Sequence, residues 1–153
     1  MSEFAFKTKS FGDCPSGKKV ECEVKLNLDE YHDKEVEYYF ELIDILGQSI
    51  TSDGPDTAMV DAEIPNMTIN SIDNLDVFNE RRVLIDIDLT EEVKSFGYID
   101  NSDRRPRFRR LCGKCSGYER ERSFARGLHE VTFQATDYAG NTVEKTRTFV
   151  VDY

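Results

Sequence analysis

Tryptophan is absent from this sequence, and histidine occurs only twice. No apolar run approaches the roughly 20 residues that a membrane-spanning helix needs, so we expect no membrane insertion. Apolar residues recur at alternate positions rather than at helical spacing, which favours β-strands. The core of this all-β fold must therefore be built from the 10 phenylalanines, the 7 tyrosines and the aliphatic residues.

Motifs of catalysis are also missing. The sequence has no HExxH zinc motif, no glycine-rich phosphate loop and no Ser/His/Asp order, so we expect no enzyme activity and no cofactor. His32 lies in a polar stretch, and His129 opens a strand-like run, where we expect a structural role. The 30 acidic residues outnumber the 20 basic ones, and the net charge of −10 disfavours nucleic acid and anionic membranes as partners.

A strand–turn–strand pattern ends the chain. Val131, Phe133 and Ala135 alternate with polar residues, as one buried face of a strand does. The run breaks at Tyr138-Ala-Gly-Asn, and a second β-rich run follows from Thr142 to Val151. Because glycine and asparagine tolerate positive φ, the pattern predicts a β-hairpin.

The same pattern occurs earlier in the chain. Residues 39–49 align with residues 132–142 at an offset of 93, which matches Phe40 with Phe133, Asp44 with Asp137 and Gly47 with Gly140. That period suits one small β-sandwich domain, so the sequence predicts an internal repeat. Two similar hairpins within one domain are the alternative. We expect a boundary near Pro65, with units at 1–61 and 62–153.

The motif Gly-x-His-x-Val-x-Phe-x-Ala-x-Asp-x-Ala-Gly-Asn, at residues 127–141, resembles the last two strands of immunoglobulin-like and fibronectin-III-like modules. Such modules stand in tandem on bacterial and archaeal surface proteins. Residues 90–100 resemble the middle of one. The resemblance covers residues 62–153 well and residues 1–61 in part. It implies an immunoglobulin-like β-sandwich, complete in 62–153 and preceded by an incomplete module, but it implies no catalytic residue.

The first unit lacks counterparts of residues 62–95, which would leave unpaired strand edges. Three explanations remain open: the chain is a piece of a longer protein, the half-module docks on the second unit, or a neighbouring subunit donates strands as in pilus-type filaments. Residues 1–6 show no signal-peptide character, so we expect either a piece of an exported protein or an intracellular chain.

The four cysteines form two pairs in the sequence. Cys14 and Cys22 span a bend that a disulfide could close. For Cys112 and Cys115 three readings stay open: a tight loop disulfide typical of exported domains, a zinc site using all four thiolates, and a thioredoxin-like redox pair. Zinc is less well supported than disulfides, because only one pair has C-x2-C spacing.

Basic residues are concentrated between Arg104 and Arg126. This segment holds nine basic against two acidic residues, so the remainder of the chain is strongly acidic. The segment predicts either an exposed strand pair whose basic residues blunt an edge, an interface for an acidic protein or glycan, or a nucleic-acid site. A head-to-tail contact between copies fits the charge pattern best. The partner-binding candidates are Arg104, Arg105, Arg107, Arg109, Arg110, Arg120, Arg122 and Arg126.

Two roles are predicted for acidic residues. Asp44 and Asp137 each precede a turn glycine by three positions, where a carboxylate accepts turn N–H groups. Calcium binds six to eight oxygens. The donors expected near the domain junction are Asp61, Glu63, Asp86, Asp88 and Asp100.

These observations predict a non-enzymatic structural or adhesive module of an extracellular or cell-surface protein. Its expected partners are other copies, neighbouring modules, or a surface glycan or protein, and it could assemble into filaments. The alternative is an intracellular zinc-stabilised module that binds nucleic acid through residues 104–126.

Overall fold

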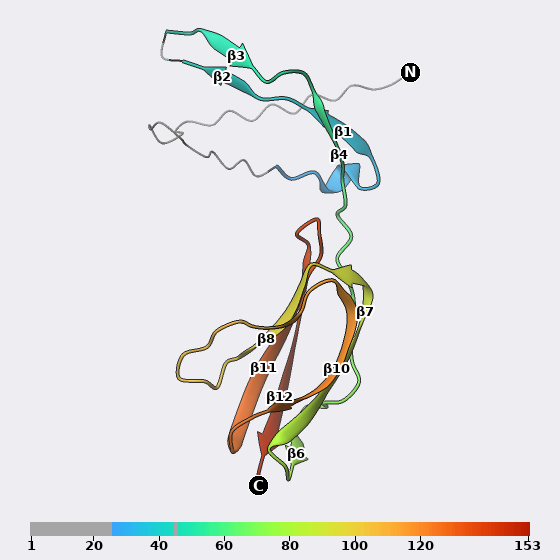
Figure 1. The fold of residues 1–153 in the computed structure, drawn as a ribbon, viewed down its shortest axis with the longest axis vertical. Coiled ribbons are helices and arrows are strands. Elements are labelled where there is room, and N and C mark those ends of the chain that lie inside the picture. The colour runs from blue at the N-terminus through green and yellow to red at the C-terminus, as the bar shows by residue number, and fades with distance from the viewer. Residues whose placement is uncertain (1–25, 45) are drawn as a thin grey trace. The chain divides into compact units, whose positions relative to one another are not determined.

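The computed structural model describes residues 26–44 and 46–153 (Figure 1). The chain divides into two compact units, residues 1–60 and 61–153. Strands make up the regular structure of the described residues, whose only helix is the single 3-10 turn η1 (Asp29–Tyr31). Within the same residues no helix is long and apolar enough to cross a bilayer.

The described part of the first unit consists of two short antiparallel ladders. Strand β1 (Glu35–Tyr38) pairs with β4 (Asp56–Met59), and β2 (Glu41–Ile43) pairs with β3 (Ser49–Thr51). The β-rich run of residues 35–46 predicts one continuous strand, and this prediction is wrong, because the strand is broken after Tyr38. The chain changes partner at Phe40. The Phe40 N–H donates to the Ser52 hydroxyl at 3.2 Å, and the Ser52 N–H donates to the Phe40 carbonyl oxygen at 2.9 Å.

The hairpin β2–β3 repeats the local geometry of the hairpin formed by β11 (Gly127–Thr136) and β12 (Thr142–Val151). Leu42 lies opposite Ile50, as Ala135 lies opposite Val143. Gly47 and Gly140 both have positive φ, 79° and 100°. The aligned hairpins thus share register and turn as well as sequence. Alternation also predicts strands at residues 4–11 and 20–28. Of these, only residues 26–28 are among the described residues, and they form no strand.

The second unit is a β-sandwich. One sheet has the order β10-β7-β5, with β5 (Met67–Ile69), β7 (Arg82–Val93) and β10 (Cys115–Ser123). The other has the order β6-β12-β11-β8-β9, with β6 (Asp76–Phe78), β8 (Ser95–Asp100) and β9 (Arg109–Cys112). All pairings are antiparallel except the parallel pair β12–β6.

The core lies between the two sheets and follows the alternation of the strands. In β11, Val131, Phe133 and Ala135 are fully buried, and in β7 the inward positions run from Val83 to Leu89. Phe133 contacts the rings of Phe96 and Tyr98. The predicted all-β sandwich with an aromatic core is confirmed, and the immunoglobulin-like fold class with it.

Two details of the second unit differ from the sequence-based expectation. β6 was not predicted, because three residues are too few to show an alternating pattern. Residues 104–111 could form a short strand by sequence, but β9 begins only at Arg109, and the residues before it form a loop that contains Pro106. Proline has no N–H to give to a ladder, which favours the later start.

Candidate functional site: an arginine loop and an acidic cluster

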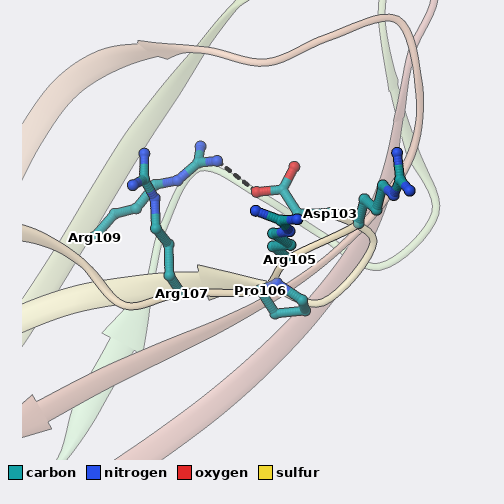
Figure 2. Close-up of a pocket in the computed structure, with 6 residues that line it drawn as sticks. Asp103, Arg105, Pro106, Arg107 and Arg109 are labelled. Carbon is teal, nitrogen blue, oxygen red and sulfur yellow. Dashed lines mark hydrogen bonds and ion pairs between the residues drawn. The ribbon is translucent and has the colours of Figure 1, made fainter.

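The loop between β8 and β9, residues 101–108, holds three arginines and is named the arginine loop here. Arg104, Arg105 and Arg107 are exposed, and none has a hydrogen bond or ion pair with the part of the chain that the structure describes. Together with Asp103, Pro106 and Arg109 they line an open pocket (Figure 2). The loop therefore presents three uncompensated guanidinium groups on one face.

The two arginines that follow the loop are already engaged. Figure 2 shows the Arg109 guanidinium directed at the Asp103 carboxylate, with which it forms an ion pair. Arg109 also donates to the Tyr98 hydroxyl at 3.4 Å, and this hydrogen bond is the main cause of its raised pKa. Arg110 donates to the carbonyl oxygen of Lys94 at 3.0 Å. These two residues shape the base of the loop.

Backbone hydrogen bonds hold one end of the loop, and close packing holds the other. Asn101 N donates to the carbonyl oxygen of Glu130 at 2.7 Å, and Asp103 N donates to that of Asp100 at 3.2 Å. At the other end Phe108 lies against Gly97, where a Cβ atom would come within 2.5 Å of both the Phe108 ring and the Arg109 carbonyl oxygen. Glycine at position 97 thus permits the close approach that positions the arginines.

The structure divides the eight predicted partner-binding arginines. Arg120 and Arg122 lie on β10, which belongs to the other sheet, and the Arg122 guanidinium covers the ring of Tyr118 at 5.5 Å. Arg126 pairs with Asp152 at 2.6 Å. A single basic strand pair is therefore not formed, because β9 and β10 do not pair with each other. Among the described residues, Arg104, Arg105 and Arg107 thus form a cluster of exposed arginines without an ion pair, while Arg120 is exposed singly on β10.

A disulfide joins Cys112 and Cys115 where the chain passes from β9 to β10. Lys114, between them, has a φ of 58°, so the bridge closes a tight turn between the two sheets. With both sulfurs in the disulfide, neither supplies a thiolate for zinc or for a redox site in this state. Cys14 and Cys22 lie outside the described residues.

Asp100, one of the predicted calcium donors, is instead paired inside the second unit. Its Oδ2 lies 2.7 Å from His129 Nδ1, and the carbonyl oxygen of Ala125 lies 2.8 Å from Nε2. Asp100 is 2% exposed and His129 is 7% exposed. His129 also packs on the rings of Phe124 and Phe149. This pair ties the base of the arginine loop to the core, a structural role for His129.

The expected calcium donors do not come together. Asp86 and Asp88 lie on β7, within hydrogen-bonding distance of Asn70 Nδ2 at 3.4 and 2.8 Å, and Asp100 faces His129. Strand alternation places Asp86 and Asp88 on the face of β7 opposite its inward aliphatic residues. Among the described residues, a compact group of acidic ligand atoms is formed by Asp61, Glu91 and Asp137, with its atoms within 4.8 Å of one another.

This acidic cluster gathers around the β11–β12 turn. Asp137 is 2% exposed, and its Oδ1 accepts the N–H groups of Gly140 at 2.6 Å and Asn141 at 2.8 Å. Asn141 Nδ2 lies 2.9 Å from Asp137 Oδ2 and 2.9 Å from the carbonyl oxygen of Glu63. The sequence indicated Asp137 as a turn cap, but nothing in it indicated that Glu91 would lie beside that cap.

Glu91 provides a test by pH. Loss of hydration raises its pKa above 4.5, and the charges of Asp137, Asp61 and Glu63 raise it further. A raised folded-state pKa means that ionised Glu91 opposes folding, so its contribution to stability is lost as pH rises through that value. We expect Glu91→Gln to raise the melting temperature at neutral pH. The gain should vanish at a pH well below the ordinary glutamate pKa, where Glu91 is protonated in both states. Thermal unfolding of both proteins at the two pH values checks this.

Calcium binding stays a prediction, now directed at Asp61, Glu91 and Asp137. Three carboxylates offer fewer free oxygens than calcium takes, because those of Asp137 already accept hydrogen bonds, so water would have to complete the shell. We expect calcium to raise the melting temperature of the wild type and a chelator to reverse the rise, with little response from Glu91→Gln. Equal responses of the two proteins would rule out this cluster.

Comparisons with known proteins bear on the fold. No protein-family model matches the sequence, and no curated protein matches it. Among solved structures, the chain is similar to one described as "Structures of Clostridium thermocellum CbhA fibronectin(III)-like modules", with 13% sequence identity and a TM-score of 0.50. The match covers 77% of this chain and 62% of that one. The likeness supports a fibronectin-III-like fold and leaves the role of the chain to its own residues.

Proposed function

We propose that this chain is a non-enzymatic structural or adhesive module of an extracellular or cell-surface protein, which binds an acidic partner through the arginine loop. The observation that carries the proposal is the set of three exposed arginines, which have no hydrogen bond or ion pair with any described residue and lie on a loop anchored at both ends. A loop anchored at both ends loses less conformational freedom on binding than an unanchored one, which favours a recognition role over a merely solvated surface.

Two further observations support the setting of this proposal. The disulfide between Cys112 and Cys115 suits an oxidising compartment. The fold is similar to that of fibronectin(III)-like modules, which suits a structural or adhesive module. The zinc-stabilised nucleic-acid module is less well supported, since one of its two cysteine pairs is oxidised here.

The test is binding to a defined polyanion. We expect the wild-type chain to be retained on immobilised dextran sulfate, and the variant Arg104→Ala, Arg105→Ala, Arg107→Ala to elute at clearly lower salt. Because the variant loses three arginine–sulfate contacts, the slope of log affinity against log salt concentration should also fall, by roughly the contribution of three neutralised charges.

The matched control is Arg81→Ala, Lys94→Ala, Arg120→Ala, which removes the same charge from exposed positions outside the loop. It should elute close to the wild type. If both triple variants lose retention equally, binding depends on net charge alone and the arginine loop is not the site. Retention on single-stranded DNA stronger than on dextran sulfate would favour the nucleic-acid alternative.

A further inference from the structure

The described part of the first unit has the opposite charge to the arginine loop. Residues 26–60 contain nine acidic residues and one basic residue, Lys34. The strongest concentration is a stretch that we name the acidic–aromatic segment, residues 35–41. It interleaves three carboxylates with three aromatic rings, namely Glu35, Glu37 and Glu41 with Tyr38, Tyr39 and Phe40.

This segment is open to a partner. No residue is buried in the part of the first unit that the structure describes. Tyr39 is 58% exposed and Phe40 is 57% exposed, and Leu42 and Ile50 next to them are more than half exposed. The three glutamates have no ion pair with any described residue. Exposed apolar side chains of this number mark an interaction surface.

The chemistry of the segment suits guanidinium groups in particular. Arginine binds carboxylates through paired N–H donors and also stacks on the faces of tyrosine and phenylalanine. A surface that offers both features within seven residues therefore matches a loop that offers three unpaired arginines. The structure already shows guanidinium groups over tyrosine rings, at Tyr98 and Tyr118.

We propose that the arginine loop of one copy binds the acidic–aromatic segment of a second copy. This inference rests on the proposed function, because it names the acidic partner of the same loop. The two surfaces differ from each other, so the contact is heterologous, and each bound copy leaves one loop and one segment free for the next. Such a contact builds an open chain unless its rotation closes a ring.

A second copy fits better than the other acidic partners. Nucleic acid would meet the negative charge of the remainder of the chain. An acidic glycan would neutralise the arginines but leave the aromatic and aliphatic side chains of the first unit exposed. A second copy satisfies the charges and covers apolar surface in a single contact.

The first experiment measures mass in solution. We expect the full chain to associate in sedimentation equilibrium as its concentration rises, and the association to weaken when salt shortens the range of charge attraction. The loop-reversed variant, Arg104→Glu, Arg105→Glu, Arg107→Glu, should weaken association by about tenfold or more. The control Arg81→Glu, Lys94→Glu, Arg120→Glu makes the same charge change elsewhere and should associate like the wild type.

The second experiment restores the contact. The segment-reversed variant, Glu35→Lys, Glu37→Lys, Glu41→Lys, should be as weakly associated as the loop-reversed one, because each alone opposes like charges. An equal mixture of the two variants should associate again, since the loop of each then matches the segment of the other. A variant that failed to fold could not give this recovery.

Three results would overturn the inference: a concentration-independent monomer, a mixture that stays monomeric, or equal loss of association in the control variant. A contact within one chain would give the first of these. If the wild type is monomeric but is still retained on dextran sulfate through its loop, the proposed function stands and only self-association is wrong. If neither occurs, both fail.

Discussion

Replacing Asp100 with leucine is expected to lower the free energy of unfolding of the second unit by about 3–5 kcal/mol, the usual cost of breaking a buried pair on one side. His129 Nδ1 would lose the carboxylate 2.7 Å away while remaining 7% exposed. The N–H of Ser102 would lose an acceptor as well, since it donates to Asp100 Oδ1 at 3.1 Å. Urea unfolding followed by circular dichroism measures the loss.

A double-mutant cycle separates the pair from the packing around it. His129→Phe keeps a ring between Phe124 and Phe149, and combining it with Asp100→Leu removes both polar partners together. Because replacing a whole buried pair by apolar groups costs far less than removing one member, the double variant should be more stable than Asp100→Leu alone. Asp88→Leu, at an exposed position, serves as the control. Additive losses in the cycle would mean that the contact between Asp100 and His129 contributes nothing of its own.

Loss of this pair should also reach the arginine loop. Asp100 ends β8 and its carbonyl oxygen accepts the N–H of Asp103, which in turn pairs with Arg109. Asp100→Leu should therefore weaken the contacts that anchor the arginine loop, so that the arginines are held less firmly in place. Weaker retention on dextran sulfate, without any change in charge at the loop itself, is the expected consequence.

The sequence predicted more of the fold than of the candidate site. The sandwich was predictable because alternating apolar residues indicate its strands, as in residues 131–135, where every second side chain is buried. The turn caps were predictable too, since Asp44 and Asp137 act on N–H groups only a few residues away. Contacts between residues that are close in the sequence can be predicted from a short stretch of it.

The acidic cluster and the division of the arginines were not predictable in the same way. Glu91 meets Asp137 because β7 and the β11–β12 turn come together in three dimensions, across 46 residues of sequence. Likewise, nothing between residues 104 and 126 shows that β9 and β10 belong to different sheets. Such contacts depend on strand order, which alternation does not encode.

The two equivalent turn caps lead to the second large prediction. Asp137→Ala should lower the free energy of unfolding by about 2–3 kcal/mol, because two backbone N–H groups and the Asn141 side chain lose their acceptor at a buried position. Asp44→Ala should cost less than about 1 kcal/mol, since the N–H groups of Leu46 and Gln48 are exposed and water can replace the carboxylate. Burial, not hydrogen-bond number alone, sets the difference.

Amide hydrogen exchange tests this difference residue by residue. In Asp137→Ala the faster exchange should spread along β11 and β12, because the turn also holds residues 61–63 through Asn141. In Asp44→Ala it should stay confined to the turn at residues 46–48. Asp137→Ala also removes a charge that repels ionised Glu91, and this effect partly offsets the loss of stability. The offset is smaller at pH 4, where Glu91 is closer to neutral, so the net loss of stability should be larger there. Equal losses in the two hairpins would show that the buried position of Asp137 adds nothing to its cap.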